Sequence, residues 1–328
     1  MIIVLFQNQN NGIEKKEIKV NDSLPPNTIW IDLIKPNLKE EKYIEKILNI
    51  EAPTEEEMDK FEIISPFYVK NDVDYMTVTV LDKASDDYPD SIAITFILTD
   101  KYLITTRYDN VKSFDYLNAW IVRDKKRALS PEYVLTATID FMVNCCADIL
   151  EEVGNEIDSL LTLVFEKPIK KKKESSQLHN EIIRKIGRAG TIISKNRESL
   201  VSLNRMVIYF SQIDNAKYMG KKESRLRIRH LANDVTSLSE YANFLSQRNS
   251  FLLDATLGMI SVEQNIIIKV FTVAAAVFMP PTLIASIYGM NFKNMPEMDL
   301  TFGYPLSLLL IVISAVIPYL YFKGKGWL

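Results

Sequence analysis

The chain has 328 residues, and its 39 Lys and Arg against 42 Asp and Glu give a formal net charge of −3. This balance offers no basic surface for nucleic acid, so no nucleic-acid partner is expected. Two Cys and two His are too few for a Cys/His metal cluster. No nucleotide-binding loop or catalytic-triad pattern occurs, which argues against an ATP-driven pump and against an enzyme.

Residues 1–129 carry the strand and turn signals of a compact α/β domain. The predicted elements are a hairpin around Asn10-Asn11-Gly12, a strand at Ile29–Ile34, a helix at Leu38–Leu48, a short helix after Pro53-Thr54, a strand pair at Tyr75–Leu81 and a hairpin that turns at Thr99-Asp100-Lys101. Alternating, β-branched residues mark the strands, and capping residues mark the helix starts. We expect this domain to lie in the cytoplasm.

Residues 130–269 have helical periodicity and form a predicted cytoplasmic stalk. Ser130-Pro131-Glu132 is a helix start, because it supplies a cap, Pro at the first helical position and an early acid. Helices are predicted to about Phe165, over Ser176–Ile213, and from about Lys221 without Pro until Pro280. The third helix would be roughly 100 Å long at 1.5 Å per residue, with the first membrane span as its end. A helix of that length needs partners along it, so oligomerisation is expected.

Two apolar stretches without charged residues follow the stalk. They are Val270–Phe292 and Leu300–Phe322, joined by the short polar loop Lys293–Asp299. A helix needs about 20 apolar residues to cross a hydrocarbon core of about 30 Å, and each stretch is long enough. The sequence therefore predicts an antiparallel membrane hairpin with an external loop at 293–299.

Flanking charges predict the orientation of this hairpin. Lys269 precedes the first span, and Lys323 and Lys325 follow the second. By the positive-inside rule both outer ends, including the tail 323–328, are cytoplasmic. We expect a multi-pass protein of the inner (plasma) membrane, embedded in the lipid bilayer.

One face of the first span carries a stripe whose spacing alternates between three and four residues. Its members are Asn265, Ile268, Thr272, Ala275, Met279, Thr282, Ser286 and Gly289. This is the a/d seam of parallel helices packed side by side, which would line a pore between subunits. Small and hydroxyl residues are also typical of ordinary helix packing in lipid, so the spacing leaves both interpretations open. The stripe has no carboxylate, so a passing cation would keep its hydration shell, as suits Mg²⁺.

Motifs around the second half of the hairpin resemble the CorA family of divalent-metal transporters. They are Tyr288-Gly289-Met290-Asn291-Phe292, Met295-Pro296-Glu297, Phe302-Gly303-Tyr304-Pro305, and Pro318–Lys323 with Trp327-Leu328. The Gly-Met-Asn tripeptide alone is weak evidence, but its place at the outer end of the first of two spans is specific. Weaker similarity in Pro53–Met58 and Thr95–Thr99 extends the resemblance over the whole chain.

The resemblance implies a homopentamer whose stalk forms a funnel leading into a pore made by the first span. Gly289, Met290 and Asn291 would form the outer ring that receives hydrated Mg²⁺ through neutral oxygens, and Glu297 would concentrate cations at the mouth. The implied pore lining and gate comprise Asn265, Ile268, Phe271, Ala275, Met279, Thr282 and Ser286. Among these, Ile268, Phe271 and Met279 match the apolar gate that stops conduction by dewetting.

The resemblance also implies a cytoplasmic metal sensor built from acids of neighbouring subunits. Asp254 matches one sensor position, and ungapped counting gives His230 as another, with Asp234 one turn on. The partner region would be Glu57–Glu62, with Glu57 and Asp59 as candidates. For His230, a solvated or packed stalk histidine is the alternative.

A basic collar at the inner mouth of the pore is the remaining implied feature. It would rest on Lys269, Lys323 and Lys325, since the tail has few other basic residues. Lys293, which follows the Gly-Met-Asn-Phe run, stands where relatives often have an acid and should weaken the attraction of the loop for cations.

These observations predict passive, potential-driven transport of hydrated Mg²⁺, with Co²⁺ or Ni²⁺ as further cargo, through a Mg²⁺-gated homopentamer. The membrane potential supplies about 2.3 kcal/mol per charge per 100 mV. A CorA-like zinc transporter is the first alternative; the intact Gly-Met-Asn tripeptide favours Mg²⁺. A non-conducting membrane-anchored signalling or scaffold protein is the second, but it leaves the polar stripe unexplained.

Overall fold

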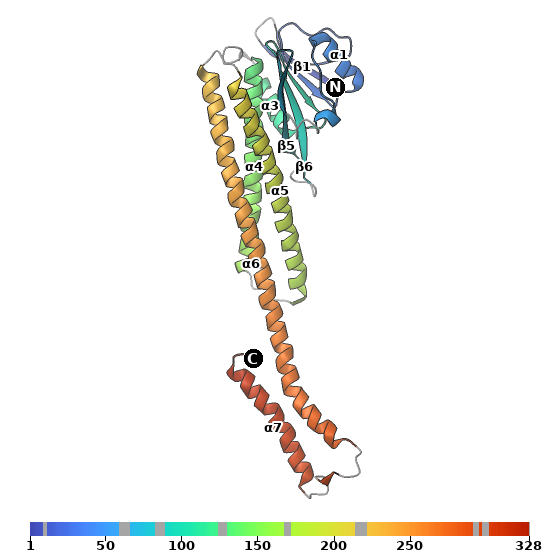
Figure 1. The fold of residues 1–328 in the computed structure, drawn as a ribbon, viewed down its shortest axis with the longest axis vertical. Coiled ribbons are helices and arrows are strands. Elements are labelled where there is room, and N and C mark those ends of the chain that lie inside the picture. Colours follow the sequence, from blue (N-terminus) through green and yellow to red (C-terminus); the bar gives the residue numbers. More distant parts are fainter. Residues whose placement is uncertain are drawn as a thin grey trace. The chain divides into compact units, whose positions relative to one another are not determined.

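The computed structural model describes residues 1–8, 12–58, 66–82, 89–123, 130–166, 172–213, 222–290, 295–296 and 302–327. The chain divides into two compact units, Met1–Leu253 and Asp254–Leu328 (Figure 1). The helices are α1 (Leu38–Leu48), α3 (Lys112–Arg123), α4 (Pro131–Glu166), α5 (Lys172–Gln212), α6 (Lys222–Tyr288) and α7 (Gly303–Gly324).

The first unit is built on a mixed sheet of seven strands in the order β2-β1-β3-β7-β6-β5-β4. The strands are β1 (Ile2–Gln7), β2 (Ile13–Ile18), β3 (Thr28–Ile34), β4 (Phe67–Lys70), β5 (Val73–Asp82), β6 (Asp90–Leu98) and β7 (Leu103–Arg107). All neighbouring pairs are antiparallel except β3 and β7, which are parallel. The α/β class expected for this part of the chain is confirmed.

Most predicted elements are confirmed close to their expected bounds. Strands β3, β5, β6 and β7, and helices α1, α4 and α6, lie where the sequence placed them, while α5 begins at Lys172 rather than Ser176. Strands β1 and β2 pair as the predicted hairpin, but Asn10 and Asn11 of its turn lie outside the described residues. Helix α1 starts with a capping box, in which Asn37 and Glu40 bond each other's backbone N–H.

Helix α3 and strand β4 were not predicted. The signal for α3 was present, because Phe114, Leu117 and Ile121 follow a helical spacing and all three are buried. Strand β4 has only four residues and a largely exposed pattern, so its sequence gives no strand signal of its own.

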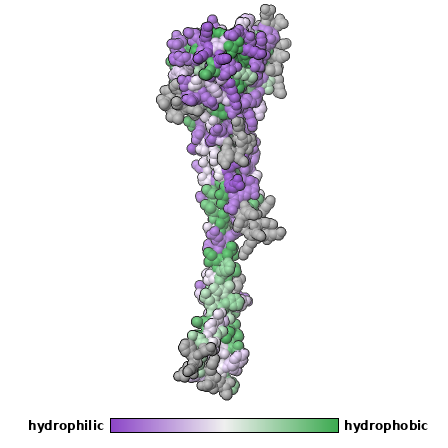
Figure 2. Space-filling view, turned by 90° about the vertical axis from the view of Figure 1, so that its right-hand side faces the viewer, coloured by the Kyte–Doolittle hydropathy of each residue, from purple (hydrophilic) through white to green (hydrophobic). Residues whose placement is uncertain are grey.

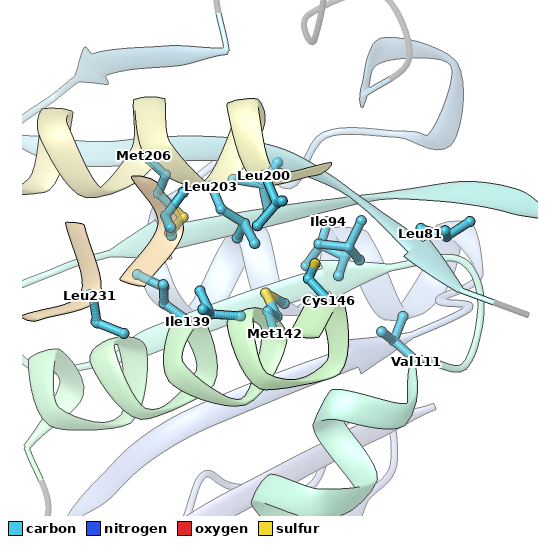
Figure 3. Close-up of a cluster of buried hydrophobic side chains, with 14 of the residues drawn as sticks. Leu81, Ile94, Val111, Ile139, Met142, Cys146, Leu200, Leu203, Met206 and Leu231 are labelled. Carbon is cyan, nitrogen blue, oxygen red and sulfur yellow. The ribbon is translucent and has the colours of Figure 1, made fainter. Parts of the chain in front are cut away.

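The larger of two hydrophobic clusters joins the sheet to α3, α4, α5 and α6, and the smaller one joins the sheet to α1. Figure 3 shows Met142 and Cys146 of α4 and Leu200 and Leu203 of α5 converging around Ile94 of β6. Helices α4 and α5 thus pack on the sheet through this cluster.

Side chains of helix α5 also accept hydrogen bonds from the part of β5 that β4 does not pair with. Strand β4 pairs only with the first residues of β5, from Val73 to Met76. Beyond that point the Thr79 N–H donates to Ser202 Oγ at 3.1 Å, and the Leu81 N–H donates to Ser199 Oγ at 2.7 Å. Two serines one turn apart on the helix thus replace a strand and close an edge that would otherwise be unpaired.

A buried ion pair stabilises the parallel β3–β7 pairing. Arg107 Nη2 lies 2.9 Å from Asp32 Oδ2, and both side chains are 2% exposed. The Thr105 hydroxyl donates to Asp32 Oδ1 at 2.7 Å, and Trp30 Nε1 donates to Thr105 Oγ1 at 3.0 Å. The carboxylate is therefore hydrogen-bonded as well as paired, which a buried charge requires.

The second unit contains the last part of α6 and α7. In the described chain three helices are long and apolar enough to cross a membrane: Pro131–Phe165, Leu226–Tyr288 and Gly303–Gly324. The apolar window of the first is 56% buried, against 6% and 0% for the others, so α4 uses its apolar residues in the core. Hydrophobic residues dominate the visible surface of the second unit, whereas the first is largely hydrophilic (Figure 2). The membrane spans are the last part of α6 and the whole of α7.

Candidate ion pathway and metal sites

Helices α6 and α7 each have one partly buried face. On α6 it comprises Val273, Ala276, Val277, Pro280, Pro281, Ile284 and Tyr288; on α7 it comprises Gly303, Ser307, Ile311, Ser314, Ala315, Pro318 and Phe322. Both sets recur every three or four residues, and the α7 set is rich in the small residues that let helices approach in lipid. On each helix this partly buried face is distinct from the exposed residues around it.

The predicted stripe on α6 lies on a different face. Asn265, Ile268, Thr272, Ala275, Met279, Thr282, Ser286 and Gly289 are all exposed. The exposed fractions of Ile268 and Met279 are 60% and 69%, and that of Phe271, the third predicted gate residue, is 72%. Packing against α7 of the same chain therefore does not account for the stripe.

A shallow groove of about 650 Å³ follows the stripe beside the two prolines. It is lined by Ala275, Phe278, Met279, Pro280, Thr282, Leu283 and Ser286. The Thr282 hydroxyl donates to the Phe278 carbonyl at 2.7 Å, and the Thr272 hydroxyl donates to the Ile268 carbonyl at 2.8 Å. Since the protons of these hydroxyls are donated inside the helix, their remaining lone pairs can accept hydrogen bonds from water.

The outer end of α6 finishes in a tightened turn at the Gly-Met-Asn motif. The Gly289 N–H donates to the Ala285 carbonyl at 3.0 Å, and the Met290 N–H donates to the Ile287 carbonyl at 3.2 Å. A Cβ at Gly289 would lie 3.2 Å from the Ala285 carbonyl oxygen, so the turn is close-fitting there. Asn291 and Glu297, the other two predicted entry residues, lie outside the described residues.

Four of the predicted sensor residues lie in the part of the chain that the structure describes. His230 and Asp234, one turn apart on α6, are exposed, as are Glu57 in the first unit and Asp254 in the second. The Glu57 carboxylate accepts bonds from the Thr54 N–H and hydroxyl at 2.9 and 3.0 Å. Among the described residues no group of three or more His, Cys, Asp or Glu is suited to a metal ion. Asp59 lies outside them.

The three lysines of the predicted collar each lie over an aromatic ring. Lys269 Nζ is 5.7 Å from the ring centroid of Trp327, so the tail after α7 folds back to α6. Lys323 lies 5.9 Å from the Tyr319 ring and Lys325 5.0 Å from the Tyr321 ring. The structure thus brings Lys269 to the tail that carries the other two.

A small cavity in the first unit was not singled out from the sequence. It has a volume of about 120 Å³ and is lined in part by Asp82, Ser113, Cys145, Asp148 and Glu152. The Ser113 hydroxyl is buried without a hydrogen-bond partner. Burial, aided by the charges of Asp148 and Asp82, raises the pKa of the Cys145 thiol to about 11. No local sequence motif marks it, because its residues come from separate elements.

Comparison with known proteins gives the family. The profile of the CorA-like Mg2+ transporter protein family matches residues 27–323. The magnesium transport protein CorA of Wolinella succinogenes is 32% identical over 307 residues, covering 92% of each chain. That of Campylobacter jejuni subsp. jejuni is 31% identical over the whole of both chains.

The fold agrees with this relationship. The solved structure of the CorA magnesium transporter from Methanocaldococcus jannaschii matches with a TM-score of 0.79 at 19% sequence identity, covering 100% of this chain and 99% of the other. The exposed α6 stripe, the Gly-Met-Asn motif at its end and the full-length sequence match all indicate the same family. The chain belongs to the family of CorA-like Mg²⁺ transporter proteins.

Proposed function

We propose that this protein carries hydrated Mg²⁺ passively across the membrane, driven by the membrane potential, through a pore lined by the α6 stripe of several copies. The observation that carries the proposal is that the whole stripe is exposed, whereas a different face of α6 is partly buried. Family membership supplies the cargo class, and the near-absence of charge on the stripe fits an ion that keeps its water.

The proposed assembly is a homopentamer with both chain ends in the cytoplasm. One hairpin encloses no pore, so a conducting path needs several subunits around an axis. The resemblance of the sequence to the CorA family supports five. Exposed apolar residues on α6, such as Phe244 and Phe251 with exposed fractions of 52% and 58%, support contacts with further copies.

Within this pore we assign entry of the hydrated ion to Gly289, Met290 and Asn291, with Glu297 attracting cations nearby. The hydrophobic gate would comprise Ile268, Phe271 and Met279, which stop conduction by excluding water when the helices close. The basic collar of Lys269, Lys323 and Lys325 would lie at the other end of the hairpin.

Regulation by Mg²⁺ is assigned to acids that different subunits would share. The candidates are Asp254, Asp234, His230, Glu57 and Asp59. The four of these that the structure describes are exposed. Oxygen ligands suit Mg²⁺, and a metal that binds the closed assembly better than the open one would favour closure.

Uptake into proteoliposomes under an imposed potential tests the function, with Mg²⁺ and Zn²⁺ compared at equal concentration. We expect Mg²⁺ uptake that follows the potential, and Asn291→Ala should abolish it while leaving assembly intact. Asn180→Ala, an exposed amide on α5, is the matched control and should transport normally. Preference for Zn²⁺ would favour the zinc alternative, and absence of any uptake would favour the scaffold alternative. Wild-type uptake by assembled Asn291→Ala protein would remove Asn291 from the entry site.

A further inference from the structure

The end of α7 has a defined turn that directs the tail back toward α6. The Trp327 N–H donates to the Phe322 carbonyl at 3.1 Å, and the Gly326 N–H donates to the Lys323 carbonyl at 3.1 Å. Gly326 has a φ of +69°, which favours glycine. The rings of Phe322 and Trp327 are 5.3 Å apart. These are the two bonds, the left-handed residue and the apolar contact of a Schellman motif.

Three cations lie over aromatic rings at this end of α7, and we call them with their rings the lysine–aromatic cluster: Lys269, Lys323 and Lys325 with Tyr319, Tyr321 and Trp327. The Schellman turn places Trp327 beside Phe322 and under Lys269. Lys323 and Lys325 lie within the turn itself and contact tyrosines of the last turns of α7. The turn therefore brings the tail to Lys269, so that all three lysines lie over aromatic rings at the same end of the helix pair.

No anion of the described chain neutralises this cluster. Residues 264–290 and 302–327 contain three Lys and no Arg, His, Asp or Glu. None of the described ion pairs includes Lys269, Lys323 or Lys325. A ring beneath an ammonium group holds it in place but leaves N–H donors free, so each Lys still has hydrogen bonds to offer an anion.

We propose that the lysine–aromatic cluster binds the phosphate of an anionic phospholipid at the membrane surface. Trp and Tyr at the ends of spanning helices sit at the level of the lipid headgroups, and basic residues next to a span attract anionic lipid. A bound lipid supplies negative charge that residues 264–290 and 302–327 lack. The inference rests on α6 and α7 lying in the membrane, and it does not depend on which ion the protein carries.

Quenching of Trp327 by brominated lipid tests the proposal in the full-length protein. Vesicles of phosphatidylcholine receive equal fractions of brominated phosphatidylglycerol or brominated phosphatidylcholine. The difference between the wild type and Trp327→Phe isolates this residue from the other two Trp. We expect brominated phosphatidylglycerol to quench Trp327 at a several-fold lower fraction. Each Lys→Gln change should reduce that preference by up to about fivefold, and the triple variant should show none.

Two controls separate specific binding from general attraction. The triple variant of Lys16, Lys39 and Lys46 to Gln removes the same charge from exposed positions of the first unit and should keep the preference. Replacing the three cluster lysines by Arg keeps the charge and should also keep the preference for brominated phosphatidylglycerol. Equal quenching by both lipids in the wild type would overturn the proposal. Displacement of the lipid by millimolar phosphate at constant ionic strength would also overturn it, since the site would then be one for soluble anions.

Discussion

Helix α6 belongs to both units and uses its apolar residues differently in each. In the first unit Leu231, Val235 and Leu245 are buried at heptad-like spacing against the helices and sheet of the same chain. In the second unit Ile268, Phe271 and Met279 follow a similar spacing but are exposed. In the first unit, apolar residues at this spacing are therefore part of an interior that one chain completes. In the second unit they form a surface that lipid or other copies of the chain must cover.

The largest expected effect is in the interior of the first unit. Asp32→Asn leaves Arg107 charged and buried without its partner, which is expected to cost about 3–5 kcal/mol of unfolding free energy. Denaturant unfolding of the full-length protein, followed by Trp fluorescence, measures it.

The matched control is an ion pair at the surface. Lys35 Nζ lies 3.3 Å from Asp109, with 63% and 31% of the side chains exposed. Lys35→Ala should cost no more than about 1 kcal/mol. Similar losses for Asp32→Asn and Lys35→Ala would mean that burial does not govern the strength of the Asp32–Arg107 pair.

The second prediction concerns the two faces of α6 in the second unit. Ala275 belongs to the stripe, whereas its neighbour Ala274 is exposed about 100° away around the helix. If the stripe lines a pore, Ala275→Trp should reduce Mg²⁺ uptake by about tenfold or more, because an indole fills the path. Ala274→Trp should keep uptake within about twofold. The same proteoliposome assay compares them, and equal loss in both variants would contradict pore lining by the stripe.

The third prediction concerns the closed edge of β5. Ser199→Ala removes the acceptor of the Leu81 N–H and should cost about 1–3 kcal/mol, since a buried donor is left unsatisfied. Ser202→Ala should cost less, because its bond is partly exposed and longer. Ser194, an exposed serine on the same helix, provides the control. Amide hydrogen exchange at Leu81 should become faster only in the Ser199→Ala variant. An unchanged exchange rate at Leu81 in that variant would contradict the role of Ser199 as acceptor of the Leu81 N–H.

Local pattern was enough for much of the fold. Alternation and turn residues located β3, β5, β6 and β7, and the Ser130-Pro131 start located α4. The bond between Ser199 and Leu81 joins residues 118 positions apart, so no local pattern predicts it. Hydropathy alone also makes α4 resemble a membrane span, and its burial against the sheet and α5 assigns it to the core.

Some of the candidate sites could likewise be predicted from a local sequence pattern, and others could not. The stripe was predictable because its residues repeat along one helix, and its exposure agrees with a role between subunits. The collar lysines were identified by charge, but their aromatic partners depend on the turn at Gly326, which brings residues 269 and 327 together. A sensor shared between subunits has no signature in one chain, because its ligands come from different copies.

The last prediction tests how closed the interior of the first unit is at Cys145. Its pKa is raised to about 11 by burial and by Asp148 and Asp82, and burial raises that of Cys146 to about 12. The neutral thiol is therefore favoured, and only the thiolate reacts with iodoacetamide. Against an ordinary thiol pKa of about 9, Cys145 should react about 100-fold more slowly than a free cysteine near pH 8. Its rate should keep rising tenfold per pH unit up to about pH 10. Mass spectrometry of the labelled protein gives the labelling rate of each cysteine at each pH. Labelling in denaturant is the control, in which both Cys145 and Cys146 react. A rate that levels off below pH 9 would show that the cavity around Cys145 is open to water.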